Sequence, residues 1–192
     1  QHISADLHDD IGASLTSINI LSQLSQQQKI DTATRNEYLQ KINDQTLEVT
    51  DALRDIVWSI NPKNDKLDLI LARMKRYATE LLESKNITYS FNANINGADE
   101  IADVDIRQNL YLIFKEAVNN MVKYADATQA VITIQKNGNQ LYLEVKDNGK
   151  GFDSGNISKG NGLGNMQRRA KAMNAKLNIS STSGAGTVVT VD

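Results

Sequence analysis

Apolar side chains recur every three or four residues along the first sixty positions, which is the spacing of one face of an α-helix. A first apolar stripe covers residues 3–24 and a second covers residues 38–60. The polar residues 26–31 interrupt the pattern, and either Asp31 or Thr32 is suited to cap the second helix. The pattern predicts two long helices joined by a short connection, which pack antiparallel as a hairpin.

Two helices alone bury little apolar surface, so a hairpin of this kind needs a further partner to complete its core. A second copy of the same hairpin would supply one, giving a four-helix bundle. The sequence therefore predicts a homodimer.

The pattern changes after the single proline, Pro62, which marks a break after the second helix. Only Gly12 precedes residue 97, and the other ten glycines follow it, so turns concentrate in the second half. The expected elements there are helices over 67–82, 105–124 and 165–173 and strands over 87–91, 130–135, 141–145, 176–181 and 187–191.

We expect an α+β protein. An N-terminal antiparallel helical hairpin, with the helices that follow it, would occupy residues 1–85. A domain of mixed helices and strands would occupy residues 86–192.

Composition narrows the function only slightly. The net charge of -2 gives no reason to expect a nucleic-acid partner, and the absence of cysteine excludes disulfides and thiolate metal sites. No apolar run is long enough to span a bilayer, so no direct membrane contact is expected for this fragment. The helical pattern is already running at Gln1, without an initiator Met, so we expect the chain to be part of a longer protein.

Candidate chemistry begins with the expected helix over residues 105–124. Glu116 and Asn120 lie four residues apart and share one helix face, with Asn119 and Lys123 close by. A carboxylate, amide oxygens and an ammonium group together suit Mg²⁺ and phosphate. Taken alone, the same cluster is more often a solvated helix face.

Glycine-rich segments provide the other candidate contacts. Asp147 directly follows an expected strand and precedes Gly149 and Gly151, which allow the backbone to approach a flat ligand closely. A second run, residues 160–164, precedes an expected helix, whose N-terminal N–H groups favour phosphate. Each segment alone is more often a simple turn.

The order and spacing of these segments resemble the ATP-binding domain of histidine kinases, an α/β sandwich shared with gyrase, Hsp90 and MutL, the GHKL class. The resemblance covers about residues 85–192. It implies that Asn120 coordinates Mg²⁺, that Glu116 is a catalytic residue that helps to organise the metal, and that residues 154–164 form an ATP lid. The other positions implied to bind ATP are Asn119, Lys123, Asp147, Gly149, Gly151, Gly162, Leu163, Gly164 and Thr187.

Within that resemblance, Asp147 would accept a hydrogen bond from the adenine amino group, with Thr187 in support, and Lys123 would touch the phosphates. Tyr124 departs from the histidine often found at its position, so no phosphate contact is assigned to it.

His8 and Asp9 lie beside the first apolar stripe. A neutral imidazole nitrogen is nucleophilic near neutral pH, and an adjacent carboxylate can orient the ring or accept its proton. A lone histidine usually has no role, and none is assigned to His2. Because an ATP pocket is expected downstream in the same chain, we assign His8 the role of phosphoryl acceptor.

Residues 7–15 resemble the phosphoacceptor motif of the HisKA_3 class of sensor histidine kinases, and residues 56–62 are similar to a subgroup found in large Bacteroidetes sensors. By this resemblance His8 and Asp9 are catalytic. Many members of the class carry glutamine where this chain has Ala13, so the resemblance does not extend to phosphatase activity.

The sequence thus predicts a two-component sensor histidine kinase core. Mg²⁺ and ATP would bind the C-terminal domain, His8 would be autophosphorylated, and an aspartate of a response regulator receiver domain would take the phosphoryl group. The resemblance places the chain in the cytoplasmic portion of an inner-membrane sensor. Two alternatives remain open: a conformational ATPase of the GHKL type, and a non-catalytic dimeric signalling scaffold.

Overall fold

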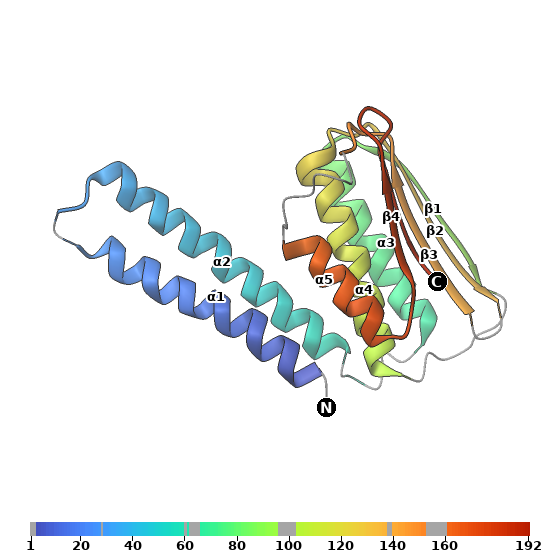
Figure 1. Ribbon diagram of the computed structural model, residues 1–192, viewed down its shortest axis with the longest axis horizontal. Helices are drawn as coiled ribbons and strands as arrows, with labels where there is room; N and C mark the ends of the chain where they lie inside the picture. The colour runs from blue at the N-terminus through green and yellow to red at the C-terminus, as the bar shows by residue number, and fades with distance from the viewer. Residues whose placement is uncertain are drawn as a thin grey trace. The chain divides into compact units, whose positions relative to one another are not determined.

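The computed structural model describes residues 3–27, 29–59, 61, 66–95, 103–137, 140–152 and 161–192, without the side chains of residues 3–10, 59, 137 and 161. The chain forms two compact units, residues 1–61 and residues 62–192. Figure 1 shows the first as a pair of helices and the second as helices beside a sheet. The α+β class expected from the sequence is confirmed.

The first unit is the expected antiparallel hairpin of α1 (Ile3–Ser25) and α2 (Thr32–Ser59). Asp31 caps α2, because its Oδ1 accepts a hydrogen bond from the Thr34 N–H at 2.8 Å and its Oδ2 one from the Thr34 hydroxyl at 2.7 Å. These bonds lower the pKa of the Asp31 carboxyl. Arg35 Nε donates to the Ser25 carbonyl at 3.1 Å and ties the start of α2 to the end of α1.

The two helices of the hairpin bury little apolar side chain between them. Val49 is the hairpin's buried apolar residue among those described, and Gln45 donates to the Ser17 hydroxyl at 3.0 Å across the two helices. Large apolar side chains remain exposed on both helices, namely Leu15, Ile20, Leu39, Leu47, Leu53 and Val57. The hairpin therefore leaves much of its apolar surface uncovered by its own chain.

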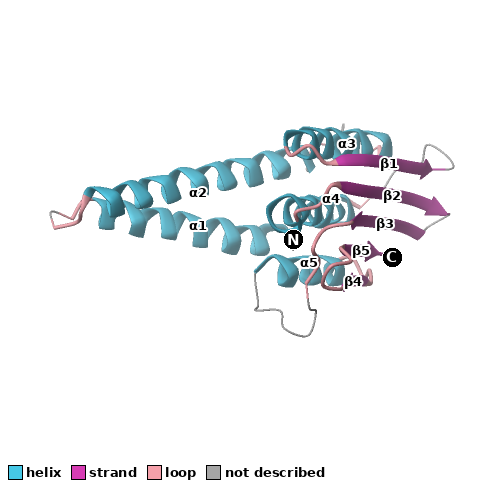
Figure 2. Cartoon of the chain, turned by 90° about the horizontal axis from the view of Figure 1, so that it is seen from above, coloured by secondary structure: helices cyan, strands magenta, loops and turns pink. Residues whose placement is uncertain are grey.

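The second unit contains a five-stranded sheet in the order β1-β2-β3-β5-β4. Its strands are β1 (Thr88–Ile95), β2 (Gln129–Asn137), β3 (Gln140–Asp147), β4 (Leu177–Ser181) and β5 (Thr187–Val191). β1 and β2 pair in parallel and every other neighbouring pair is antiparallel, which Figure 2 shows from above. The parallel pair requires a crossover between its strands, and the helix between them provides it.

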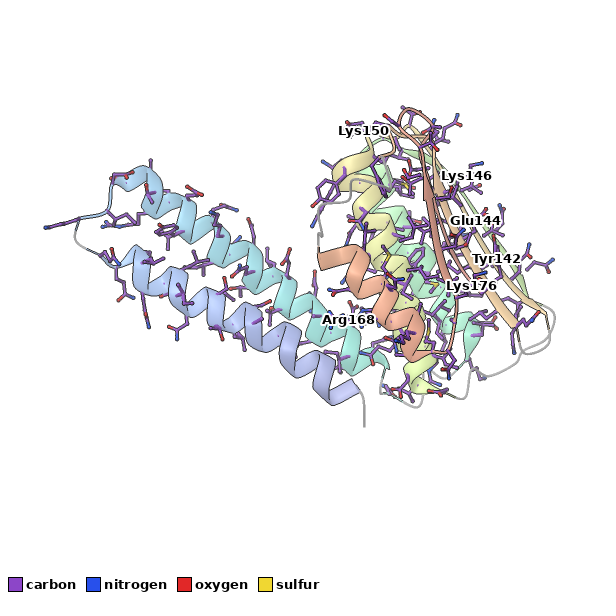
Figure 3. The ribbon with its side chains drawn as sticks, viewed as in Figure 1. Tyr142, Glu144, Lys146, Lys150, Arg168 and Lys176 are labelled. Atoms are coloured by element: carbon purple, nitrogen blue, oxygen red, sulfur yellow. The ribbon has the colours of Figure 1, made fainter. Side chains whose placement is uncertain are left out.

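Three helices cover one face of this sheet: α3 (Leu67–Ser84), α4 (Val104–Asn120) and α5 (Asn161–Ala172). Alternation along β3 shows the consequence, because Leu143 and Val145 are buried between Tyr142, Glu144 and Lys146, which follow one another along the strand in Figure 3. The large apolar side chains that are fully buried are Ile70, Met74, Leu82, Ile113, Phe114, Val118, Ile132, Ile134, Leu143 and Met166.

Helix α3 belongs to the second unit, which differs from the boundary at residue 85 expected from the sequence. Ile70, Met74 and Ala78 on its inner face are fully buried, and the Thr79 hydroxyl lies 2.6 Å from the Tyr89 hydroxyl on β1. A helical period shows that one face is apolar without showing what covers it. In α3 the covering elements are α4 and β1.

The expected helix over residues 105–124 is regular only to Asn120 and continues as a π-helical turn, η2 (Met121–Ala125). Asp126 then adopts a left-handed conformation, with φ 51° and ψ 36°, and ends the helix. π-Helical turns are rare and often lie at functional sites. This one falls within the segment implied to bind nucleotide.

Candidate functional site

The face of α4 that carries Glu116 and Asn120 meets the start of α5. A Cβ atom added to Gly162 would overlap Oε1 of Glu116 and lie 3.7 Å from Nδ2 of Asn120. The structure thus brings together the first and third candidate segments, about forty residues apart in sequence. Only glycine fits this contact without displacing the Glu116 carboxylate.

Asn119 faces a different neighbour. Its Oδ1 accepts a hydrogen bond from the Tyr77 hydroxyl of α3 at 2.7 Å. Adjacent residues on an α-helix diverge by about 100°, so Asn119 and Asn120 serve different sides of α4. Sequence reasoning did not identify Tyr77 as a site residue, because it lies 42 residues earlier and belongs to no motif.

The π-helical turn presents Lys123 and Tyr124 to solvent. Tyr124 is 64% exposed. An exposed ammonium group one turn beyond Asn120 is available to a phosphate. The position of Lys123 in the structure is compatible with the phosphate contact expected from the sequence.

Asp147, at the end of β3, is only 6% exposed. The N–H of Gly149 donates to its Oδ1 at 2.8 Å, and the N–H of Thr187 also bonds to the carboxylate. Burial raises the pKa of the Asp147 carboxyl, and the two N–H donors oppose that effect. A buried carboxylate with unused acceptor capacity suits a ligand that brings its own donor, such as an exocyclic amine.

Close backbone approaches surround Asp147. A Cβ added to Gly149 would lie 2.7 Å from the Cβ of Ala125 and would overlap its carbonyl oxygen, and the Lys150 N–H donates to that oxygen at 2.7 Å. Gly151 has φ +57° and Gly186 has φ +81°, a backbone region that side chains disfavour. These glycines bring the strand ends and η2 together around the carboxylate.

Thr187 is held in place by Ser181 on the neighbouring strand. The two hydroxyls lie 2.9 Å apart, the Ser181 hydroxyl also lies 3.1 Å from the Gly186 carbonyl, and the Phe152 N–H donates to Ser181 Oγ at 2.9 Å. Sequence reasoning did not identify Ser181, because a single serine in a strand stands at no recognisable spacing from the candidate motifs.

Helix α5 begins at Asn161, so Gly162, Leu163 and Gly164 lie inside its first turn, whereas the sequence placed the glycines before the helix. The first four N–H groups of a helix have no partner within it. The shift therefore keeps their N–H groups at a helix N-terminus, the environment that favours phosphate.

Several predicted parts lie outside the described residues. His8 and Asp9 lie on α1, but their side chains are not described, and residues 154–160 of the expected lid are also outside the described residues. The same is true of Pro62.

The described part of the chain holds no group of three or more His, Cys, Asp or Glu side chains that could enclose a metal ion. Mg²⁺ bound with a nucleotide usually takes only one or two protein ligands, and phosphates and water supply the others. The side chains of Glu116 and Asn120 beside Gly162 fit that donor set.

Two family models match the chain. Residues 105–192 match HATPase_c, described as histidine kinase-, DNA gyrase B- and HSP90-like ATPase, and residues 1–65 match HisKA_3, described as histidine kinase. The chain is also 31% identical over 196 residues to the oxygen sensor histidine kinase NreB of Staphylococcus carnosus, an alignment that covers all of this chain and 55% of NreB. The chain therefore spans about half the length of this relative.

Solved structures show the same fold. The histidine kinase domain of the blue-light activated histidine kinase of Erythrobacter litoralis EL346 matches with a TM-score of 0.58 and 17% identity, over 96% of this chain and 93% of that one. The Acinetobacter baumannii histidine kinase AdeS matches with a TM-score of 0.59 and 14% identity, over 96% and 95%.

The sheet, its helices and the glycine contacts around Asp147 define an ATP-binding domain of the class shared by histidine kinases, gyrase and HSP90. With the HisKA_3 match before it, the chain belongs to the sensor histidine kinases and is a two-component histidine kinase core. Among the described residues, no helix is long and apolar enough to cross a membrane.

Proposed function

We propose that this core binds Mg²⁺ and ATP in its second unit and phosphorylates His8. The observation that carries the proposal is the convergence of Gly162 on Glu116 and Asn120. One unit then contains three features suited to binding a nucleoside triphosphate. They are a buried carboxylate for the base, amide and carboxylate oxygens for the metal, and a helix N-terminus for the phosphates.

The adenine end of the nucleotide would lie at Asp147. Its carboxylate would accept a hydrogen bond from the adenine amino group, while the N–H groups of Gly149 and Thr187 hold the carboxylate in place. Gly151 and Gly186 allow neighbouring backbone segments to pass close to one another beside this carboxylate.

The phosphate end would lie between α4 and α5. Asn120 would coordinate Mg²⁺ with Glu116 organising the site, and Lys123 together with the N–H groups of Gly162, Leu163 and Gly164 would contact phosphate oxygens. The metal would supply charge neutralisation on those oxygens when bound.

The phosphoryl group would pass from ATP to a ring nitrogen of His8. In this transfer the bond between the γ-phosphorus and the β–γ bridging oxygen breaks, a phosphorus–nitrogen bond forms, and ADP leaves. Asp9 would orient the imidazole and help to accept its proton. Because the attacking nitrogen is neutral near pH 7, no unusual pKa is required.

The partners follow from the family. A homodimer would complete the hairpin, and an aspartate of a response regulator receiver domain would receive the phosphoryl group. Membrane anchoring of the full-length protein, and its Bacteroidetes-type affiliation, remain predictions from sequence.

The test is incubation with ATP labelled at the γ-phosphate. We expect acid-labile, alkali-stable label on the protein, lost in both His8→Ala and Asn120→Ala. Mixing these two variants distinguishes transfer within a chain from transfer between chains, because only transfer between chains restores the label. Release of inorganic phosphate without labelled protein would instead support a conformational ATPase, and absence of ATP binding would support a scaffold.

A further inference from the structure

One side chain of α3 reaches the segment of α4 that carries the proposed metal ligand. The Tyr77 hydroxyl donates to Oδ1 of Asn119 at 2.7 Å. Asn119 directly precedes Asn120, and the regular part of α4 ends at Asn120. The contact therefore acts on the last regular turn of the helix.

The Tyr77 ring is itself firmly held. Its centroid lies 6.3 Å from that of Tyr111 and 6.4 Å from that of Phe114, both in edge-to-face arrangements, and Lys115 Nζ lies 5.5 Å from the ring centroid. Tyr111, Lys115 and Asn119 are spaced four residues apart, so they form one stripe on α4. All three contact the side chain of Tyr77.

Helix α3 provides a rigid base for this contact. Its Met74 and Ala78, which flank Tyr77 in sequence, are fully buried. A hydroxyl carried on such a base cannot follow α4 if α4 rotates about its axis. The Tyr77–Asn119 hydrogen bond, which we call the α3–α4 clasp, therefore opposes rotation of the end of α4.

Rotation matters because Asn120, like Glu116 on the same helix, must face Gly162 on α5. Beyond Asn120 the backbone adopts the π-helical turn, whose hydrogen bonding differs from that of the helix before it. The Met121 N–H still bonds to the carbonyls of Ala117 and Val118, but the helix is no longer regular beyond that residue. A side-chain bond at Asn119 adds a further restraint on the orientation of Asn120.

We propose that Tyr77 and Asn119 are positioning residues for the nucleotide site: the α3–α4 clasp sets the orientation of Asn120 toward Mg²⁺, and Asn119 does not contact the nucleotide. This role replaces the direct ATP contact that the sequence implied for Asn119. The proposal rests on the proposed metal role of Asn120.

The test compares Tyr77→Phe with Tyr89→Phe in the full chain. Tyr77→Phe keeps the ring contacts and removes only the hydroxyl of the clasp. Tyr89→Phe is a matched control, because it also removes one tyrosine hydroxyl bonded to a side chain, here Thr79, at the other side of α3. ATP binding is titrated by calorimetry for each, once with Mg²⁺ and once with EDTA, and thermal unfolding is recorded.

We expect Tyr77→Phe to weaken ATP binding about fivefold in Mg²⁺, the size of one lost hydrogen bond, and to leave binding in EDTA unchanged. Tyr89→Phe should change neither. Equal weakening with and without Mg²⁺, or unaltered binding throughout, would overturn the proposal. If the wild-type chain binds no ATP at all, the proposed function fails first, and that result is distinct from either.

A second variant tests the part of the proposal that concerns Asn119. Asn119→Ala should match Tyr77→Phe in Mg²⁺-dependent affinity, and the double variant should be no worse than either single one. A much larger loss in Asn119→Ala than in Tyr77→Phe would show that Asn119 touches the nucleotide, and would overturn its assignment as a positioning residue.

Discussion

The two units differ in how they treat their apolar side chains. In the sheet unit, apolar residues from all three helices and from the inner sheet face are buried against one another. In the hairpin, Val49 is the buried apolar residue among those described, while Leu39, Leu53 and Val57 lie exposed on α2. One unit completes a core from its own chain, and the other does not.

This difference separates two tasks. A nucleotide pocket needs side chains held at fixed positions, which a closed core provides. A hairpin with an uncovered apolar face is suited to joining a second copy. Leu39 and Val57 are eighteen residues apart, which is five helical turns, so they project from the same side of α2. The following predictions would break or sharpen this contrast.

The largest expected effect comes from His8→Ala, which should abolish labelling from ATP completely. Affinity for Mg²⁺-ATP, measured by calorimetry, should stay within about twofold of wild type, because removing one hairpin side chain leaves the pocket intact. Persistent acid-labile label would show that another residue is the acceptor, and a loss of ATP binding would show that the two units are not independent.

A charge on the exposed apolar side of α2 should dissociate the proposed homodimer. In Leu39→Glu an unpaired carboxylate would enter the apolar interface, at a cost of several kcal/mol, and light scattering should report a mass near the 21.2 kDa of one chain. Val131→Glu is the control, because Val131 lies on the uncovered sheet face opposite Lys146, where a carboxylate is accommodated. If Leu39→Glu remains dimeric, this side of α2 is not the interface.

Replacement by alanine should have different effects on Mg²⁺-ATP binding at Gly162 and at Gly164, the two glycines in the first turn of α5. Gly162→Ala should weaken Mg²⁺-ATP binding about tenfold, because its Cβ displaces the Glu116 carboxylate, and a lost charge-assisted contact is worth roughly 1.5 kcal/mol. The added Cβ of Gly164→Ala meets none of the described residues within 4 Å, so this variant should bind normally, with its free energy of unfolding raised by up to about 1 kcal/mol. Calorimetric titration and thermal unfolding measure both, and equal affinities would remove Gly162 from the site.

The smallest effect concerns the protonation of Asp147. Burial raises the pKa of this carboxyl in the folded state above its ordinary value of 3.8, so the folded state holds the proton more tightly than the unfolded one. The stabilisation that the protonated Asp147 carboxyl provides is complete below pH 3.8 and is lost as the pH rises through the pKa of the folded state. Asp147→Asn should remove that decline, which denaturant unfolding at several pH values would reveal.

The same titration should affect adenine recognition. Adenosine carries no phosphate, so its affinity reports on the adenine end alone. We expect it to fall a few-fold as the pH drops through the raised pKa of Asp147, because a neutral carboxyl is a weaker acceptor than a carboxylate. A change that begins only at the pH of an ordinary aspartate would contradict the effect of burial.

Local pattern alone was sufficient for most elements of the fold. Helical periods predicted α1 to α5 and alternation predicted β1 to β5, with ends that differ by a few residues, because these periods follow from backbone geometry. The π-helical turn η2 was not predicted. The motifs containing Glu116, Asp147 and Gly162 were recognisable for a similar reason, since turns and close backbone approaches demand particular residues at particular spacings.

Other features arise only when distant segments pack together. The parallel pairing of β1 with β2 and the contact of Tyr77 with Asn119 each join residues about forty apart. The assignment of α3 to the sheet unit likewise depends on which elements cover its apolar face. The residue types at such contacts are common, and their spacing carries no period, so no local rule identifies them. Asn119 and Asn120 are two asparagines adjacent in sequence. They have different neighbours, Tyr77 and Gly162, because α4 packs against α3 on one side and α5 on another.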